Sequence, residues 1–173
     1  GYNEGLWWVQ DYAAMLPIFS LKNIKNKKVA DLCAAPGGKT FQVLSKNSEI
    51  DSFDKSEAKL VLFKKNLARL QLSKNCNIYL KNVLEQKINA KYDLVILDAP
   101  CSALGTIRRN PEIFFRKSEP DFDNIEKIQY KLLDKAKEIL KPNGQILYMV
   151  CSFLKSECEN QIYKFLKKND NFS

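Results

Sequence analysis

An aspartate and two cysteines stand directly after two apolar segments. The run 92–97 is followed by Asp98 and, past a proline, by Cys101, and the run 145–150 is followed by Cys151. Such runs predict strands buried on both faces of a parallel sheet, which binds ligands at the carboxyl ends of its strands. A thiol there can act as a nucleophile, and a carboxylate can move a proton. Taken singly, Asp98 could cap a turn and Cys101 could be a small buried side chain, but a second thiol in an equivalent place favours chemistry.

A glycine turn follows the first predicted strand, 29–33. The segment Ala34-Ala35-Pro36-Gly37-Gly38-Lys39-Thr40 leads from it into a helix predicted over 41–46. A strand, a glycine turn and a helix start in this order favour a ligand that approaches the backbone closely. The segment is not a P-loop, because that motif needs a glycine where Cys33 stands.

An acidic residue, Asp54, ends the next predicted strand, 49–54. Dinucleotide-binding folds hold ribose hydroxyls with an acid in this region, although Asp54 could instead cap the helix that follows it. Further strands are predicted over 77–82, 92–97 and 145–150, and helices over 12–19, 56–70, 124–140 (stopped by Pro142-Asn143-Gly144) and 155–168. This alternation predicts one α/β domain over 1–173, with helices on both faces of a doubly wound parallel sheet.

Composition narrows the class of protein. The chain has 173 residues, a net charge of +8, five cysteines and no histidine. The charge favours a nucleic-acid partner, and Arg108 and Arg109 lie in a loop that could hold phosphates or simply be solvated. No apolar run is long enough for a membrane span, scattered thiols are poor metal ligands, and free cysteines favour the reducing cytoplasm. We therefore expect a cytoplasmic monomer that binds neither a membrane nor a metal.

Three motifs then resemble a known family. The segments 31–40, 98–102 and 150–152 are similar to those of the RNA cytosine-5 methyltransferases of the RsmB/Sun (Fmu) and NOL/NOP/Sun group, and the similarity extends from Gly5 to Gln161. The resemblance implies a Rossmann-like class I fold that uses S-adenosylmethionine. We expect the closing strands of that fold and the family's N-terminal RNA-binding region to lie outside this chain.

The resemblance also implies roles for the cofactor site. The segment Cys33-Ala34-Ala35-Pro36-Gly37-Gly38-Lys39 would wrap the methionine end of the cofactor, Asp54 would grip the ribose, and Asp98 would be a further acid of the site. Asn82 falls where the family usually has an aspartate near the adenine, so cofactor affinity could suffer. Other departures from the family pattern are Lys59, Ala103 and Val150.

By the same resemblance, Cys151 is the nucleophile that bonds to carbon 6 of cytosine, and Cys101 serves product release. Lys39 and Asp98 would touch the target base, which must leave its stack. A free thiol has a pKa of roughly 8.5, so we expect the start of the last helix, or Lys39, to favour the thiolate of Cys151. Ribosomal RNA is the favoured substrate. Transfer RNA, DNA cytosine methylation and a cofactor- or RNA-binding fragment without turnover are the alternatives.

Overall fold

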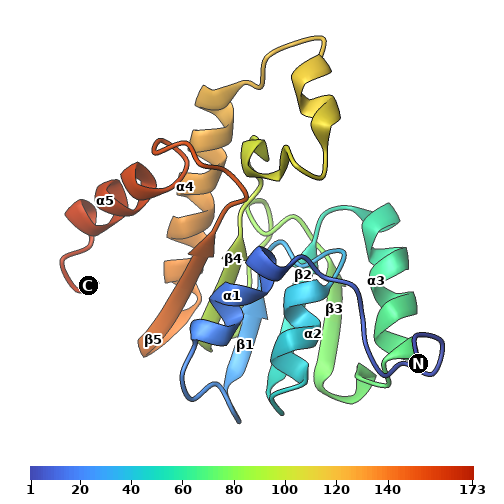
Figure 1. The fold of residues 1–173 in the computed structure, drawn as a ribbon. Helices are drawn as coiled ribbons and strands as arrows, with labels where there is room; N and C mark the ends of the chain where they lie inside the picture. The colour runs from blue at the N-terminus through green and yellow to red at the C-terminus, as the bar shows by residue number, and fades with distance from the viewer.

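A five-stranded parallel sheet forms the centre of the molecule, as the computed structural model of residues 1–173 shows (Figure 1). The strand order is β3-β2-β1-β4-β5. The strands are β1 (Lys28–Asp31), β2 (Glu49–Asp54), β3 (Cys76–Leu80), β4 (Tyr92–Asp98) and β5 (Leu140–Met149). Since the chain runs outward from β1 to β3 and then returns to place β4 on the other side of β1, the order reverses between β1 and β4. Ligands of open α/β sheets bind outside the carboxyl ends of the strands at such a reversal.

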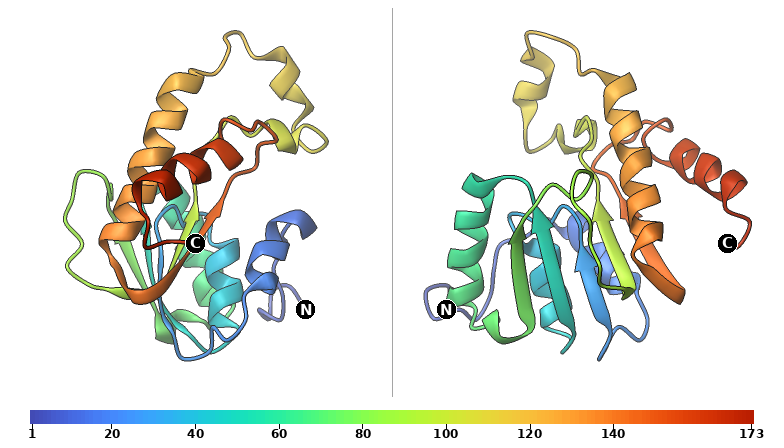
Figure 2. Two further views of the ribbon diagram at one scale, coloured as in Figure 1. Left: turned by 90° about the vertical axis from the view of Figure 1, so that its left-hand side faces the viewer. Right: turned by 180° about the vertical axis from the view of Figure 1, so that it is seen from behind.

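Helices cover both faces of this sheet (Figures 1 and 2). One face carries α1 (Tyr12–Ser20), α2 (Gly38–Leu44) and α3 (Glu57–Arg69), and the other carries α4 (Phe122–Glu138) and α5 (Glu159–Lys168). Along β4, Leu94 and Ile96 belong to the first core and Val95 and Leu97 to the second. Side chains of a strand alternate between faces, so a strand covered on both sides must be apolar throughout. The prediction of a doubly wound α/β sheet is confirmed.

Two predicted boundaries around glycine or proline were wrong. The helix expected over 41–46 begins at Gly38, because Gly37 adopts a left-handed conformation with φ 111° and completes the turn before it. The helix expected over 124–140 ends at Glu138. The Pro142-Asn143-Gly144 segment does not stop it but lies within β5, as an irregularity between the Tyr92–Leu140 and Leu94–Gln145 pairs.

Two predicted helix starts also differ. The last helix begins at Glu159 rather than at residue 155, because Cys158 has a non-helical backbone with φ −110° and ψ −99°. The alternative role of Asp54 as the cap of α3 is wrong, since Ser56 is the N-cap and its hydroxyl accepts the Lys59 amide at 3.4 Å. The apolar face predicted for this helix is confirmed, because Leu60, Phe63, Leu67 and Leu70 are buried.

Two features of the structure, its helices and its groups of acidic and cysteine side chains, decide whether it could span a membrane or bind a metal ion. None of the helices combines the length and the apolar character that crossing a bilayer requires. No group of three or more acidic or cysteine side chains is arranged to hold a metal ion.

The central strand should dominate the stability of the fold. Ile96 on β4 is fully buried between its neighbours β1 and β5, so we expect Ile96→Ala to lower the free energy of unfolding by about 2–5 kcal/mol. Urea unfolding followed by circular dichroism measures the change. Val61→Ala on the exposed side of α3 is the matched control and should change stability by less than about 0.5 kcal/mol. Equal effects of the two substitutions would contradict this account of the core.

Candidate active site

The carboxyl ends of β4 and β5 bring the two thiols together. These strands pair in parallel up to Asp98 and Met149, and the amide of Ala99 donates to the Met149 carbonyl at 2.9 Å. Beyond that point the chains run side by side, and the Sγ atoms of Cys101 and Cys151 lie 3.2 Å apart. The thiols that follow two separate apolar runs in the sequence are therefore in direct contact.

The contact divides the two sulfurs into a thiolate and a thiol. A hydrogen bond from Cys101 lowers the pKa of Cys151 to about 7, and this outweighs the opposing effects of burial and of Asp98. The same hydrogen bond, together with burial, raises the pKa of Cys101 far above its usual value. The more exposed sulfur, Cys151, is therefore the one that ionises. The expected help from a helix start is absent, because α5 begins only at Glu159.

A lysine and an aspartate form an ion pair beside the thiols. Lys39 lies in the first turn of α2 and Asp98 at the end of β4, and the Nζ and Oδ2 atoms are 2.5 Å apart. The Lys39 side chain is mostly buried and Asp98 is partly exposed. The pair lies at the carboxyl ends of β1 and β4, which is the point where the strand order reverses. It thus offers one donor and one acceptor at the place where this sheet type binds ligands.

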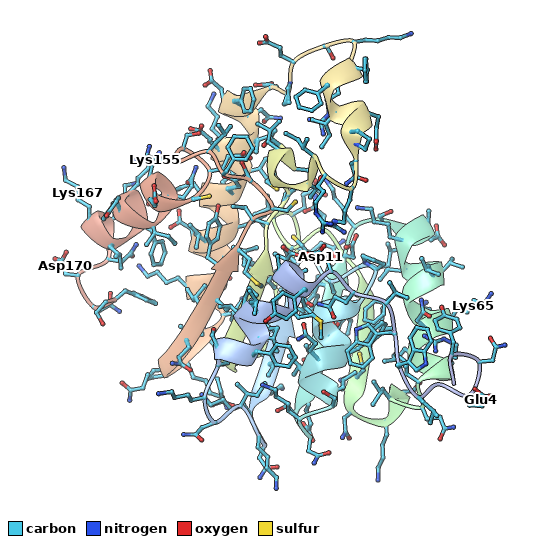
Figure 3. All side chains as sticks on the ribbon, viewed as in Figure 1. Glu4, Asp11, Lys65, Lys155, Lys167 and Asp170 are labelled. Carbon is cyan, nitrogen blue, oxygen red and sulfur yellow. The ribbon has the colours of Figure 1, made fainter.

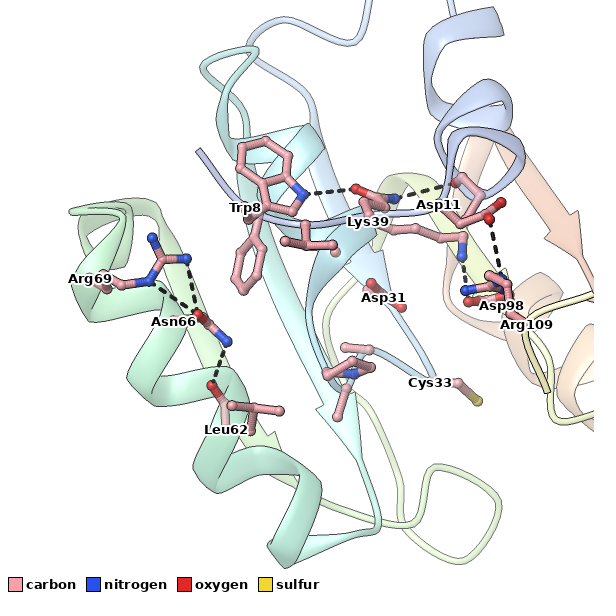
Figure 4. A pocket seen from close by; sticks show the side chains of 18 of the residues that line it. Trp8, Asp11, Asp31, Cys33, Lys39, Leu62, Asn66, Arg69, Asp98 and Arg109 are labelled. Atoms are coloured by element: carbon pink, nitrogen blue, oxygen red, sulfur yellow. Dashed lines mark hydrogen bonds and ion pairs between the residues drawn. The ribbon is translucent and has the colours of Figure 1, made fainter. Parts of the chain in front are cut away.

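Two cavities adjoin at this point and share a wall made of Cys33, Ala35 and Asp98. The first, of about 500 Å³, lies beneath the N-terminal segment and is lined also by Lys39, as Figure 4 shows. The second, of about 280 Å³, is lined also by both Cys101 and Cys151. Together the cavities cross the carboxyl ends of the strands from the N-terminal segment to the thiols.

The residues expected to hold a cofactor divide between these cavities. Ala34, Pro36 and Gly38 line the first, and Asp54 and Asn82 line the second. Gly37 lines neither; a Cβ there would lie 2.5 Å from the Phe41 ring, so this glycine shapes the turn. Cys33 lines both cavities, and burial raises its pKa to about 12, so it stays a thiol.

Backbone amides and a neighbouring acid hold Asp54 and Asn82 in the wall of the second cavity. The Asp54 carboxylate accepts the amides of Ala35 at 3.0 Å and Ser56 at 2.8 Å, one on each oxygen. Each oxygen keeps a second lone pair that can accept a hydroxyl. The Asn82 amide donates to Glu85 at 2.6 Å, and its oxygen accepts the Leu84 amide at 3.2 Å. Asn82 therefore shapes a turn at the cavity wall.

Comparison with known proteins places this geometry in a family. A model described as 16S rRNA methyltransferase RsmB/F matches residues 18–173. The chain belongs to this family. It is 36% identical to ribosomal RNA small subunit methyltransferase B of Photorhabdus laumondii over an alignment of 178 positions, which covers 99% of this chain and 41% of the relative. The RsmB/F chain thus spans about two fifths of the length of the curated relatives that it matches, at 39–41% of each.

Solved structures agree with this assignment. The protein PH0851 superimposes with a TM-score of 0.91 at 33% identity, over 97% of this chain and 39% of that one. NSun6 from Pyrococcus horikoshii, solved with SFG, an analogue of S-adenosylmethionine, gives a TM-score of 0.87 at 25% identity, over 96% and 44%. The family and the Rossmann-like methyltransferase fold that the motifs indicated are both confirmed.

Sequence reasoning missed one acid in the site of this RsmB/F chain. Asp31 lines the first cavity, is 1% exposed, accepts the Thr40 hydroxyl at 2.9 Å and leaves Oδ1 without a partner. Burial raises the pKa of Asp31 to about 7, against the lowering effects of Thr40 and Lys39. Its position directly before the glycine turn was the signal that could have found it.

The N-terminal segment lines the first cavity with Trp8, Gln10 and Asp11. The Trp8 indole donates to Gln10 at 2.8 Å and packs edge-on against Phe41, so Trp8 clamps the segment onto the domain. The Asp11 carboxylate accepts the Ala13 amide at the start of α1 and pairs with Arg109 at 3.2 Å. In Figure 3, Asp11 lies near the middle of the molecule, whereas the labelled Lys65, Lys155, Lys167 and Asp170 lie at its periphery. Arg109 therefore belongs to the wall of the first cavity rather than to a freely solvated loop.

The pKa difference between the thiols predicts selective alkylation. We expect iodoacetamide to modify Cys151 first, with a rate that rises with pH through a midpoint near 7, because only the thiolate reacts. Removing the donor in Cys101→Ala should raise this midpoint by about 1 pH unit, the loss of one charge-assisted hydrogen bond. Mass spectrometry of the Cys151 peptide measures the rate.

Cys76→Ala is the control for this experiment. Burial raises the pKa of Cys76 to about 11, and this residue lies on β3, outside the lining of both cavities. Its loss should leave the Cys151 midpoint unchanged. Faster alkylation of Cys101 than of Cys151 in the unmodified protein would reverse the assignment of thiolate and thiol.

Proposed function

We propose that this chain carries the catalytic part of an S-adenosylmethionine-dependent methyltransferase that modifies carbon 5 of a cytosine in small-subunit ribosomal RNA. The observation that carries the proposal is the 3.2 Å contact of Cys101 and Cys151 in the wall of a cavity that also contains Asp54. The names of the RsmB/F family and of the curated relatives support ribosomal RNA over transfer RNA and DNA.

Cys151 acts as the nucleophile. Carbon 5 of cytosine is a weak nucleophile, and addition of a thiolate to carbon 6 moves the electrons of the C5–C6 double bond toward carbon 5. A pKa of about 7 means that roughly half of the Cys151 side chains carry the thiolate at neutral pH. The partly exposed position of this sulfur leaves it open to a base that has left its stack.

Lys39 and Asp98 orient the base. The Lys39 ammonium can donate to N3 or O2 of the pyrimidine, which withdraws electrons and favours the addition to carbon 6. The Asp98 carboxylate can accept from the exocyclic amine. Their 2.5 Å contact holds the donor and the acceptor side by side. Any general-acid assistance to N3 then comes most directly from Lys39, since Asp98 is occupied as its counter-ion.

Cys101 completes the reaction. While Cys151 is a thiolate, it accepts the Cys101 proton in a hydrogen bond and holds the pKa of Cys101 high. Once Cys151 is bonded to carbon 6 it no longer carries that charge, so the main cause of the raised pKa is gone. After carbon 5 has accepted the methyl group, Cys101 can release its own proton to solvent and take the proton from carbon 5. The electrons of the C5–H bond then restore the C5–C6 double bond, and the sulfur of Cys151 leaves carbon 6 as a thiolate. The chain has no histidine, so the base is Cys101, a carboxylate or water, and the 3.2 Å contact with Cys151 favours Cys101.

The cavities suit the methyl donor. S-adenosylmethionine supplies the methyl group that carbon 5 accepts. Asp54, with a free lone pair on each carboxylate oxygen, would hold the ribose hydroxyls, and the wall around Asn82, which includes Val83, would hold the adenine. The Cys33–Lys39 turn would surround the methionine end, where the unpartnered Oδ1 of the buried Asp31 could accept an ammonium group.

The RNA would approach over the loop after β4. Arg108 is 86% exposed and lies 3.8 Å from Asp11, so its guanidinium is available to a phosphate. The net charge of +8 favours such contacts without specifying a sequence. We expect the protein to work as a monomer in the cytoplasm, where ribosomal RNA is found.

The proposal predicts different fates for the two cysteine variants. With tritiated S-adenosylmethionine and small-subunit ribosomal RNA, we expect Cys151→Ala to lose more than about 10³-fold in transfer rate, because the covalent step is lost. Cys101→Ser should methylate once and then accumulate a protein–RNA adduct, because release from carbon 5 is blocked. Gel shift under denaturing conditions detects the adduct.

Calorimetry separates the proposal from its main alternative. Cys76→Ser should retain activity and form no adduct, and all variants should bind S-adenosylhomocysteine alike. Binding of this ligand by unmodified protein that transfers no label would favour a cofactor- and RNA-binding part without turnover of its own. An adduct in Cys151→Ala but not in Cys101→Ser would exchange the two roles.

A further inference from the structure

A fully buried glutamate lies behind the two thiols. Glu157, in the turns before α5, has no exposed surface. Its Oε1 accepts the amide of Ser102 at 2.8 Å and the Gln129 side chain at 3.1 Å, and its Oε2 accepts the Ser102 hydroxyl at 2.6 Å. The Ser152 hydroxyl lies 3.2 Å from that of Ser102 and so reaches the carboxylate through Ser102. Glu157 itself follows Ser152 in the same segment, where its amide donates to the Leu154 carbonyl at 3.1 Å. The two serines directly follow the two thiols in the sequence.

The two cysteine–serine loops are built alike and are joined at Glu157. The Ser102 hydroxyl accepts the Leu104 amide at 3.4 Å, and the Ser152 hydroxyl accepts the Leu154 amide at 3.2 Å, so each serine closes a turn directly after its cysteine. The Ser102 hydroxyl also binds the Glu157 carboxylate, and the Ser152 hydroxyl lies 3.2 Å from the Ser102 hydroxyl. A displacement of either loop would therefore break contacts to Glu157.

Glu157 is charged although it is buried. Burial alone would raise its pKa, but the hydrogen bonds from Ser102 and Gln129 and the nearby Ser152 hydroxyl outweigh burial and lower the pKa below its usual value. No lysine or arginine pairs with it. A buried carboxylate without a cation is costly unless donors surround it, so the loops have to keep their positions to satisfy it.

We propose that Glu157 is a positioning residue that sets the separation of Cys101 and Cys151. Its carboxylate binds Ser102, the residue after Cys101, and it belongs to the segment that carries Ser152, the residue after Cys151. It touches neither sulfur and acts through the loops. The role of this separation in methyl transfer rests on the function proposed above, but the separation itself is a property of the protein without RNA. Glu157 is therefore expected to act on the hydrogen bond by which Cys101 stabilises the Cys151 thiolate.

The test measures the pH midpoint of Cys151 alkylation in the absence of RNA. In Glu157→Gln, the NH2 group of the new amide faces the N–H and O–H donors of Ser102 or the side-chain NH2 of Gln129. Two donors cannot form a hydrogen bond, so the loop that carries Cys101 should move away from residue 157. We expect the midpoint to rise by about 1 pH unit, as for loss of one charge-assisted hydrogen bond. The groups that act on the Cys151 thiol are Cys101, Asp98 and Lys39. Loss of a nearby negative charge would by itself lower the midpoint, so the sign separates positioning from a through-space effect.

A double substitution identifies the route of the effect. In Cys101→Ala the donor is already absent, so adding Glu157→Gln should shift the midpoint no further. Additive shifts would overturn the proposal, as would an unchanged or lowered midpoint in the single variant. Glu159→Gln, at an exposed acid in the first turn of α5, is the matched control and should match the unmodified protein.

Two further measurements cover a loss of folding and a loss of activity. If Glu157→Gln does not fold by circular dichroism, Ser102→Ala removes one donor and should give a smaller rise; an unchanged midpoint in folded Ser102→Ala would overturn the proposal. In the methyl-transfer assay, Glu157→Gln should lower kcat at least about tenfold, the equivalent of one hydrogen bond to a charged group, with the affinity for S-adenosylhomocysteine unchanged. Suppose that the midpoint rises in Glu157→Gln but the unmodified protein transfers no methyl group. That result would support the positioning role of Glu157 and would count only against the proposed function.

Discussion

The parallel pairing of β4 with β5 is the constraint on which the site depends. Asp98 lies opposite Met149, so the chains leave the sheet at the same level and the next thiols meet at 3.2 Å. Side chains alternate along a strand, and a slip of one residue would turn the second thiol toward the opposite face. The register is held because both faces of the sheet are buried, as shown by Leu94 and Leu97 on opposite sides of β4. The packing of the core thus fixes the distance between two sulfurs at its edge.

The two thiols of the site differ in their tendency to ionise. The chain has no histidine, and the thiols share a hydrogen bond that makes one of them acidic and the other basic. The charged form is the more exposed one, where solvation helps it, and the neutral form is the more buried one. Lys39 adds a smaller favourable effect, and Asp98 opposes it. The pair therefore needs no helix dipole to ionise.

The architecture could be predicted because the residue patterns that indicate strands and helices lie within short stretches of the sequence. The strand over 49–54 and the buried face of the helix after it follow from short apolar patterns that tertiary contacts do not override. The resemblance to the RsmB/Sun family named the thiols, Lys39 and Asp98 as site residues, and the structure brings them together. What the sequence missed depends on contacts between distant segments. Glu157 reads as one surface acid among many until the fold buries it against Ser102, and the irregularity in β5 exists only because Leu140 and Gln145 face β4.

Gly105 lies where the loop after β4 contacts the loop after β5, and this contact limits how either loop can be replaced. Its amide donates to the Cys151 carbonyl at 3.0 Å, and a Cβ on it would stand 3.0 Å from that same oxygen, so any side chain there would push the two backbones apart. A loop taken from another enzyme and inserted after β4 would have to fit against the unchanged backbone of the loop after β5. Exchange of one loop alone should fail even with both cysteines retained, whereas transplanting the two as a unit preserves the fit. The two loops therefore form one structural unit.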